Sequence, residues 1–432
     1  MSDRAILALR GKPLSALAEA ARALDAQDPL RHLADDFLVP PGQVYLCGNS
    51  LGLQPKATRA KINAELDTWA RMGVAGHFSG LNPWADIDST CVASMARVVG
   101  AQPSEVGVMN SLTVNLHLLL VSFYRPIEHR RVLLIEKDAF PSDRFAVESH
   151  VASRGLDPAQ CIRVARDVGT EALLEEMREL GDALALVMVG GVHYLTGVAL
   201  NIAALTVQAH AQGALVGFDL AHAAGNVRLR LHDDGVDFAV WCGYKYLNAG
   251  PGGLASVFVH DRHHGQPMAR FHGWWGSRTR FKMTLGFDAE QGAKAWQLSN
   301  PPVFQMVALR ASLDVFDRVP DLAALFAKSR ALTLLLEVAL ECAMPRGCYE
   351  VLNPVVATSR PTLRGAQLSL RFAQPVAKAV NDRLARRGFV CDERDPDVLR
   401  VSPVPLYSSY AQVVQFAGVL AEEIAALTGS RL

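Results

Sequence analysis

The sequence predicts an α/β fold with a mostly parallel β-sheet covered by helices on both faces, and a separate, smaller α+β lobe. Two observations lead to this expectation. From about residue 55 to residue 302, short apolar runs rich in β-branched residues alternate with stretches of helical periodicity, which is typical of parallel sheets buried on both faces. After Pro302, helical patterning dominates before short strands return. We therefore expect a large domain over 55–302 and a small α+β domain over 303–432.

The first half of the chain supplies the elements of the large domain. Strands are expected at 106–109, 132–135, 162–165, 184–189, 214–218 and 236–241, and helices at 55–72, 112–121, 142–153, 171–180 and 202–212. The first helix carries Ile62, Leu66 and Trp69 at spacings that put them on one face. Ligands of parallel sheets bind at the carboxyl ends of the strands, so this edge is where we expect a site.

The rest of the chain supplies the small domain. Helical patterning runs from Val303 to Cys342 and is broken near Pro320. Strands then follow at 367–372, 389–390 and 399–401, with helices at 375–387 and 411–427. The N-terminal segment, 1–54, is too short for its own core, so we expect it to pack on this lobe.

Composition and charge exclude several classes of protein. The 432 residues include 43 basic and 43 acidic side chains, so no basic field attracts nucleic acid or a membrane surface. No apolar run approaches the roughly 20 residues of a membrane span, and residues 1–31 lack the apolar core of a signal peptide. Seven scattered cysteines without Cys-x-x-Cys spacing predict reduced thiols in a cytoplasmic protein, without a metal or disulfide role.

The most informative segment is Trp-Cys-Gly-Tyr-Lys-Tyr-Leu-Asn-Ala-Gly-Pro, residues 241–251. Lys245 follows an apolar strand and precedes glycines that let another group approach closely. It can form a Schiff base with an aldehyde, or be an ordinary surface lysine. Asp219, after another apolar run, can hold a proton on a ring nitrogen or cap the next helix, and His222 can lie by the ring or simply pack in a loop. Lys245 and Asp219 are the two anchors that pyridoxal 5'-phosphate requires.

Two further segments can complete such a site. Asn110-Ser111-Leu112-Thr113 precedes an apolar helical run, so its backbone N–H groups and the Thr113 hydroxyl suit a phosphate, although serine and threonine at helix starts are usually caps. Tyr244 can donate its hydroxyl to the same phosphate. In the loop Ala139–Asp143, Phe140 can stack on the ring and Asp143 can accept from a ring substituent; the alternative is a core aromatic and a helix cap.

With these motifs in order, the chain resembles the kynureninase family over essentially its whole length. The strongest matching segments are Leu46–Pro55, Met109–Leu119, Phe140–Asp143, Phe218–Asn226, Trp241–Gly253, Gly273-Trp274-Trp275-Gly276, Ser299–Pro302 and Arg400–Tyr407. So many ordered motifs separate the chain from cysteine desulfurases and aminotransferases. The resemblance implies the fold type I of pyridoxal-phosphate enzymes with a seven-stranded sheet. It also implies hydrolysis of L-kynurenine to anthranilate and L-alanine, and of 3-hydroxy-L-kynurenine to 3-hydroxyanthranilate and L-alanine, in tryptophan catabolism or NAD biosynthesis.

The resemblance also implies a role for each matching residue. Lys245 would carry the Schiff base, Asp219 would contact the ring nitrogen, and Tyr244 would relay a proton. The cofactor would also be held by Leu112, Thr113, Phe140, Asp143, His222 and Tyr244, and by Trp274 and Asn300 from the other subunit of a homodimer. Arg400 would clamp the substrate α-carboxylate, with Ser50, His77 and Asn300 near the substrate. Gly190 stands where a serine often lines the cofactor site, which leaves its part open.

The expected reaction begins when the lysine, freed from the cofactor, takes the α-proton; water then adds to the γ-carbonyl and the Cβ–Cγ bond breaks. Because His77 and Asn300 can hydrogen-bond a ring hydroxyl, we expect the 3-hydroxy substrate to be accepted at least as well, unless His77 faces water. One alternative is β-elimination or transamination on the same cofactor, which would share Lys245 and Asp219. The other is a binding or scaffold protein of this fold, against which the intact Lys245, Asp219 and Arg400 argue.

Overall fold

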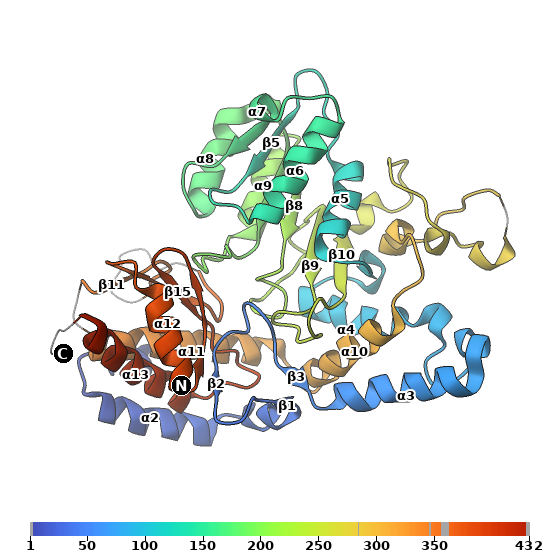
Figure 1. The fold of residues 1–432 in the computed structure, drawn as a ribbon. Coiled ribbons are helices and arrows are strands. Elements are labelled where there is room, and N and C mark those ends of the chain that lie inside the picture. The colour runs from blue at the N-terminus through green and yellow to red at the C-terminus, as the bar shows by residue number, and fades with distance from the viewer. Residues whose placement is uncertain (1–2, 284, 345–346, 356–362, 429–432) are drawn as a thin grey trace. The chain divides into compact units, whose positions relative to one another are not determined.

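The computed structural model describes residues 3–283, 285–344, 347–355 and 363–428, in two compact units (Figure 1). Unit 1 comprises Met1–Lys56, Leu195–Ala199 and Arg318–Leu432, and unit 2 comprises Ala57–Tyr194 and Leu200–Asp317. The division differs from the expected boundary after Pro302, because α10 (Val303–Asp317) packs on α3 (Ala57–Met72) and α4 (Ser89–Val99). This helix therefore belongs with the large unit.

Unit 2 is built on a seven-stranded sheet, as the sequence predicts. The strands, from one edge to the other, are β4 (Val106–Val108), β10 (Ala255–Val259), β9 (Phe238–Cys242), β8 (Leu215–Asp219), β7 (Leu184–Gly190), β5 (Val132–Ile135) and β6 (Ile162–Val164). Strands β9 to β6 pair in parallel, whereas β10 is antiparallel to both of its neighbours. The mostly parallel α/β architecture is confirmed.

Helices bury both faces of this sheet. The remaining helices of unit 2 are α5 (Leu112–Phe123), α6 (Pro141–Ser153), α7 (Pro158–Cys161), α8 (Thr170–Leu180) and α9 (Ile202–Ala211). Every residue of β7 is buried. Leu186 and Met188 share a core with α5 and α6, while Val187 and Val189 point to the other face because side chains alternate along a strand.

One expected feature of unit 2 differs from the structure. The helix expected at 55–72 forms as α3, but two residues of its expected apolar face are exposed in the described structure: Leu66 is 43% exposed and Trp69 is 59% exposed. An apolar stripe on a helix predicts that the stripe is buried. The ring of Trp69 contacts that of Phe304 in unit 2, but more than half of Trp69 stays exposed.

Unit 1 combines helices with an antiparallel sheet. Its four-stranded sheet has the order β11 (Tyr349–Val351), β12 (Leu368–Phe372), β15 (Val398–Val401) and β14 (Asp392–Arg394). Its helices are α1 (Asp3–Leu7), α2 (Leu14–Gln27), α11 (Leu322–Ala343), α12 (Ala377–Arg386) and α13 (Tyr410–Thr428). Two short pairs complete it: β13 (Phe389–Val390) with β2 (Val44–Tyr45), and β1 (Phe37–Leu38) with β3 (Gln54–Pro55). Buried side chains of α2, α11 and α13 form one core with the sheet.

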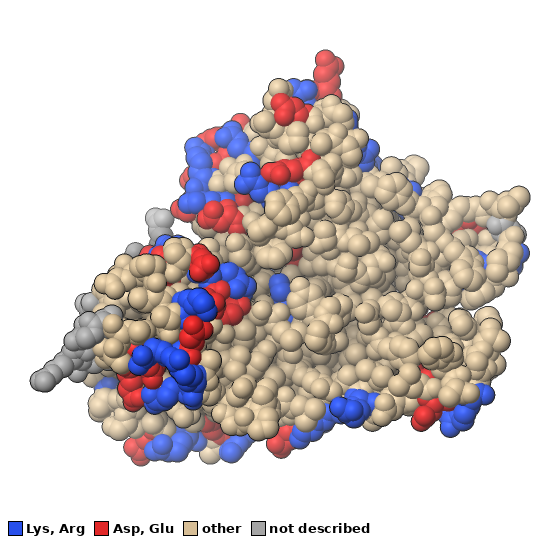
Figure 2. All heavy atoms as spheres, viewed as in Figure 1, with Lys and Arg blue, Asp and Glu red and all other residues tan. Residues whose placement is uncertain are grey.

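The surface carries both signs of charge. On the face drawn in Figure 2, lysines and arginines are interspersed with aspartates and glutamates over α12, α13 and α8, and no field of one sign extends across it. Within the described ranges, no helix combines the length and the apolar character needed to cross a bilayer.

Candidate active site

A cavity of about 500 Å³, its mouth included, lies in unit 2 where several strands end. The residues around it that the sequence analysis proposed for the cofactor are Leu112, Thr113, Phe140, Asp143, Asp219, His222, Tyr244 and Lys245, and Gly190 lines it as well. Parallel strands β8 and β7 deliver Asp219 and Gly190, and the Lys245 loop follows the end of β9. The cavity is therefore at the edge where ligands of parallel sheets bind.

Lys245 presents its amine to this cavity. Its Nζ lies 2.9 Å from Nε2 of His222 and 5.8 Å from the ring centre of Phe140. The side chain is half-buried, not a freely solvated surface lysine. Burial raises the pKa of Tyr244, with the neighbouring Cys242 adding to the effect, so the phenol keeps its proton and can donate it. An amine, an imidazole and a phenol thus meet at one end of the cavity.

Three carboxyl groups converge on the same cavity. Burial first, and then the nearby Asp219, raise the pKa of Asp143 well above its usual range. Burial also raises the pKa of Glu136 to about 7, although a hydrogen bond from the Gly190 N–H opposes the rise. Asp219 is 8% exposed, and its Oδ1 accepts the Ala221 N–H at 2.7 Å. A protonated ring nitrogen would place a positive charge beside these carboxyl groups.

Two helix starts supply donors for an anion. The Thr113 hydroxyl, in the first turn of α5, lies 2.8 Å from that of Ser142, in the first turn of α6. Ser111 precedes α5 without a side-chain capping bond. Free N–H groups and the positive end of each helix favour a phosphate, so these hydroxyls have a use beyond capping.

The arrangement fits pyridoxal phosphate. The buried Oδ1 of Asp143 has no hydrogen-bond partner among the described residues. The cavity therefore contains a polar atom with which a bound group can form a hydrogen bond. Phe140 is 42% exposed and meets Tyr194 edge-on at 5.3 Å, so it is an aromatic of the cavity wall, not of the core. An amine, acids and hydroxyl donors are the groups that the aldehyde, ring nitrogen and phosphate need.

Three residues of unit 2 that were expected near the substrate or cofactor do not line this cavity. Trp274 is 48% exposed, and its Nε1 donates to the Arg280 carbonyl. Asn300 is exposed. His77 is half-buried, with Nδ1 3.3 Å from the Val74 carbonyl and its ring 5.2 Å from that of Trp84. Their expected roles stay predictions.

The expected substrate residues of unit 1 lie on β15 and in the turn after β2. Arg400 is 1% exposed, and its Nε donates to Oδ1 of Asp392 at 2.6 Å while its second nitrogen pairs with Oδ2. Such a bidentate pair fixes the plane of the guanidinium. Ser50 is half-buried, with its N–H donating to the Cys47 carbonyl at 3.0 Å.

The structure adds residues that sequence reasoning missed. Glu136, Ser142, Val192, Tyr194 and Ala221 also line the cavity. Ser142 belongs to the loop Ala139–Asp143, and its place after Pro141 at a helix start is a usable signal. Glu136 follows the strand 132–135 directly, where a polar residue at a carboxyl end was a weaker one.

Known proteins resemble this chain closely. A family model described as the kynureninase C-terminal domain matches residues 325–420. The chain is 50% identical over 415 residues to the kynureninase of Myxococcus xanthus, which covers 93% of this chain and 96% of the relative. It is 49% identical over 412 residues to that of Xanthomonas oryzae, covering 92% and 96%. It is 47% identical over 424 residues to that of Stenotrophomonas maltophilia, covering 95% and 98%.

Solved structures share the fold at low identity. The Escherichia coli cysteine desulfurase CsdA superposes with a TM-score of 0.75 at 17% identity, covering 92% of this chain and 98% of that one. C-DES, in a mutant with glycine covalently linked to its pyridoxal-phosphate cofactor, gives a TM-score of 0.76 at 17% identity, covering 91% and 99%. These likenesses confirm the expected fold type. Identity near one half over nearly the full length of its relatives shows that the chain belongs to the kynureninase family.

Proposed function

We propose that this chain hydrolyses L-kynurenine and 3-hydroxy-L-kynurenine to L-alanine and the corresponding anthranilate, with pyridoxal phosphate as cofactor. The observation that carries the proposal is the cavity that unites Lys245, Asp219 and the hydroxyls of Thr113 and Ser142, in a chain 50% identical to a kynureninase. The same anchors would serve a β-elimination or a transamination, but the family relationship favours hydrolysis.

The cofactor, when bound, supplies an aldehyde for the substrate amine and a ring that accepts the electrons of a carbanion. Lys245 is the residue that we propose takes the α-proton, and His222, 2.9 Å from its Nζ, can hold that amine in line. Asp219 would keep a proton on the ring nitrogen, because an ionised carboxylate beside it raises the pKa of that nitrogen. Tyr244, kept protonated by burial, would donate to the phosphate and relay a proton to the leaving fragment.

Arg400 is proposed to bind the substrate α-carboxylate. Asp392 holds it through Nε and one terminal nitrogen, so the guanidinium plane is already oriented before a substrate arrives. Orientation in advance reduces the entropy lost on binding. Ser50 is proposed to lie near the substrate as well.

A homodimer with shared sites is supported by an apolar surface on unit 2. Phe78, Trp274 and Phe281 form what we call the aromatic face, with ring centres 5.4 Å apart for Phe78 and Phe281 and 6.0 Å apart for Trp274 and Phe281. They are 63%, 48% and 45% exposed. In Figure 2 the segment around 270–290, gold in Figure 1, carries few charged side chains on the face in view. Exposed apolar patches of this kind mark interfaces, and Trp274 would reach the partner's cofactor.

His77 and Asn300 are proposed to contact the substrate ring from across that interface, which would favour the 3-hydroxy substrate. A cytoplasmic location is supported by the cysteines, since all seven are free thiols and a reducing compartment keeps them so. The reaction would then serve tryptophan catabolism or NAD biosynthesis.

The deciding experiment gives the purified protein, loaded with pyridoxal phosphate, both substrates side by side. We expect the fluorescence of the anthranilate product together with equimolar alanine, and kcat/KM for 3-hydroxykynurenine at least equal to that for kynurenine. Sulfide or a keto acid from other amino acids, with no anthranilate, would contradict the proposed reaction. A strong preference for unsubstituted kynurenine would contradict only the part given to His77 and Asn300.

A further inference from the structure

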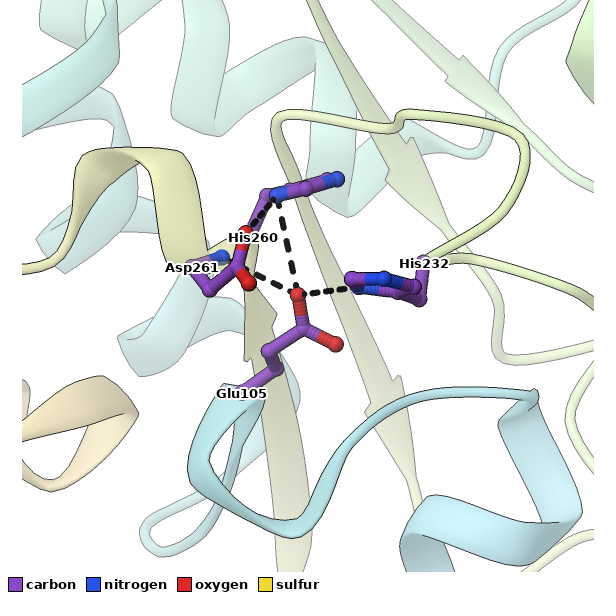
Figure 3. A group of neighbouring side chains, drawn as sticks. All are labelled: Glu105, His232, His260 and Asp261. Atoms are coloured by element: carbon purple, nitrogen blue, oxygen red, sulfur yellow. Dashed lines mark hydrogen bonds and ion pairs between the residues drawn. The ribbon is translucent and has the colours of Figure 1, made fainter.

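Four side chains of metal-ligand type lie together in unit 2 (Figure 3). They lie at the opposite ends of the sheet strands from the cavity. Glu105 ends a 3-10 helix directly before β4, and His232 precedes β9. His260 and Asp261 follow β10, which is antiparallel to both β4 and β9. The starts of β4 and β9 therefore lie beside the end of β10, whereas Lys245 and Asp219 lie beyond the carboxyl ends of β9 and β8.

The donor atoms of these side chains face one another. Oε1 of Glu105 lies 2.9 Å from Nδ1 of His232 and 3.6 Å from Nδ1 of His260, and that Nδ1 lies 2.7 Å from Oδ1 of Asp261. One ligand atom from each of the four lies within 4.8 Å of the others. Donors around a tetrahedral zinc ion, at bonds of about 2.0–2.1 Å, stand about 3.3 Å apart. The three donor distances of 2.7, 2.9 and 3.6 Å lie on both sides of this value, so the four side chains would adjust to reach zinc-binding distances.

Glu105 is fully buried, and its carboxylate is held by both backbone and side-chain groups. The backbone holds it from two sides, since Gln102 N–H donates to Oε2 at 2.8 Å and Asp261 N–H donates to Oε1 at 3.0 Å. Its side-chain partners in the described part of the chain are imidazoles, with no lysine or arginine among them. A buried carboxylate is stabilised by a positive charge beside it, and a metal ion between these donors would supply one.

A second buried carboxylate in unit 2 shows the contrast. Asp237 receives the Arg262 guanidinium at 2.8 Å, as well as the imidazoles of His210 and His263 at 2.9 and 2.8 Å. That cluster contains its own permanent cation. The Glu105 cluster has equivalent imidazoles in place, and a metal ion would take the position that the guanidinium has beside Asp237.

We propose that Glu105, His232 and His260 bind a zinc ion, with Asp261 as the fourth ligand. Two imidazole nitrogens with carboxylate oxygens suit zinc, whereas calcium and magnesium prefer oxygen ligands alone. The ion would fasten the start of β4, the segment before β9 and the end of β10 to one another. Because these ends face away from the cavity edge of the sheet, its role is structural, and substrate turnover does not depend on it.

The test measures zinc in the holoenzyme. Protein treated with a chelator, then with zinc chloride, and passed through a desalting column should retain one zinc per chain by elemental analysis. Isothermal titration with zinc should give a Kd that rises at least about 100-fold in His232→Ala, which alters a half-exposed side chain and should fold normally. Zinc at 100 times Kd should raise Tm by roughly a few degrees in the wild type, and not in His232→Ala.

The control is His210→Ala, which removes an imidazole from the Asp237 cluster and should bind zinc as the wild type does. Turnover of the cofactor-loaded enzyme should agree within about twofold with and without zinc, since the site is at the other edge. Retention of less than a tenth of a zinc per chain would overturn the proposal, as would equal zinc affinity in the wild type and His232→Ala, because zinc would then be bound elsewhere.

Discussion

At the scale of single residues, Asp219 and Lys245 reach one cavity because β8 and β9 are adjacent parallel strands. Neighbouring strands lie about 4.8 Å apart, so parallel pairing brings the end of β8 and the loop after β9 to the same side of the sheet.

Lys245→Ala tests the assignment of the amine. We expect a folded protein whose thermal unfolding shifts little, because the residue lies in a strand-end loop and is half-buried. The visible absorption band of bound pyridoxal phosphate should be lost, and kcat should fall by at least about 10³-fold. The matched control is Lys61→Ala, a partly exposed lysine of unit 2 paired with the partly exposed Asp314, which should leave both the absorption band and turnover unchanged. Normal turnover by Lys245→Ala would refute the assignment.

Arg400→Ala separates substrate binding from folding. Loss of the group that binds the substrate carboxylate should cost about 2–5 kcal/mol of binding free energy, and KM should rise accordingly. The substitution also leaves Asp392 without its bidentate partner, which should lower the free energy of unfolding by about 3 kcal/mol. In Arg400→Ala/Asp392→Ala, stability should return in part while KM stays high. If KM is normal in either variant, another group binds the α-carboxylate.

Glu136 makes stability depend on pH. Its pKa is raised from 4.5 to about 7 in the folded chain, chiefly by burial, so between these values the folded state binds a proton that the unfolded state has released. Stability of the cofactor-free protein should therefore fall as pH rises from about 4.5 through about 7, by roughly 3 kcal/mol in total. Urea unfolding of wild type and Glu136→Gln across this range checks it. A difference between the two that is independent of pH would be inconsistent with this sign.

Much of the candidate site follows from sequence, because strand ends and helix starts can be read from local pattern. Asp219 and Thr113 were expected at such ends, and both line the cavity; their roles stay predictions. Glu136 was not expected, since its burial depends on contacts with Gly190 on another strand. A Cβ at Gly190 would stand 3.0 Å from Oε1 of Glu136, so the glycine leaves room for that carboxyl where a serine would crowd it.

At the scale of elements, two helices bring their first turns to the same place. The 2.8 Å contact between Thr113 and Ser142 joins the starts of α5 and α6, and the two helices pack together through Leu116, Val147 and their neighbours. Both helices therefore direct the positive end of the dipole toward one point.

Ser142→Ala and Thr113→Val should each weaken the binding of the cofactor phosphate at the two helix starts. Each removes one hydroxyl that can donate to a charged phosphate, a bond worth about 1.5–3 kcal/mol, so the Kd of pyridoxal phosphate should rise about 10–100-fold. Titration of cofactor-free protein followed by absorbance measures it. Ser149→Ala is the control, because that hydroxyl, also on α6, donates to the Ala146 carbonyl instead. Equal losses in all three variants would mean a general effect on folding.

Elements with strong local patterns were predicted well, and those defined by their partners were not. The strand 132–135 and the helices around 112–121 and 202–212 match β5, α5 and α9 closely. β14, Asp392–Arg394, contains only charged residues and is a strand because it pairs with β15. β11 likewise forms by pairing with β12. β10 was not expected either, but for a different reason: it lies inside the sheet with all five residues buried, and its apolar run was missed. Sequence periodicity reports which side chains are buried, and a short edge strand buries few of them.

At the scale of the whole molecule, the aromatic face and one side of α3 are exposed apolar surfaces among the described residues, and we propose that a second copy of the chain covers them. Leu66 and Trp69 have the spacing of a buried stripe and yet are exposed. The sequence pattern is the same whether such a stripe is buried within its own chain or left exposed on it. A second copy would cover them and bring Trp274 to its partner's cofactor.

Heterodimers test this directly. Lys245→Ala and Trp274→Ala chains should each be inactive as homodimers, because every site lacks either its amine or its borrowed aromatic. When the two are unfolded together and refolded as a mixture, about a quarter of the wild-type activity should return, since half of the chains form mixed dimers with one intact site each. Sedimentation should show a dimer throughout. No recovery of activity, or a fully active monomer, would be incompatible with shared sites.

Unit 1 is assembled from the two ends of the chain, with Met1–Lys56 at one and Arg318–Leu432 at the other. During synthesis α2 leaves the ribosome long before α11 and α13, the helices on which it packs. At roughly 5–20 residues per second, the delay is on the order of ten seconds or more. A helix of 14 residues is marginal in water by itself, so α2 stays with its apolar side uncovered during this time, and a chain that ends before α11 lacks both helices on which α2 packs.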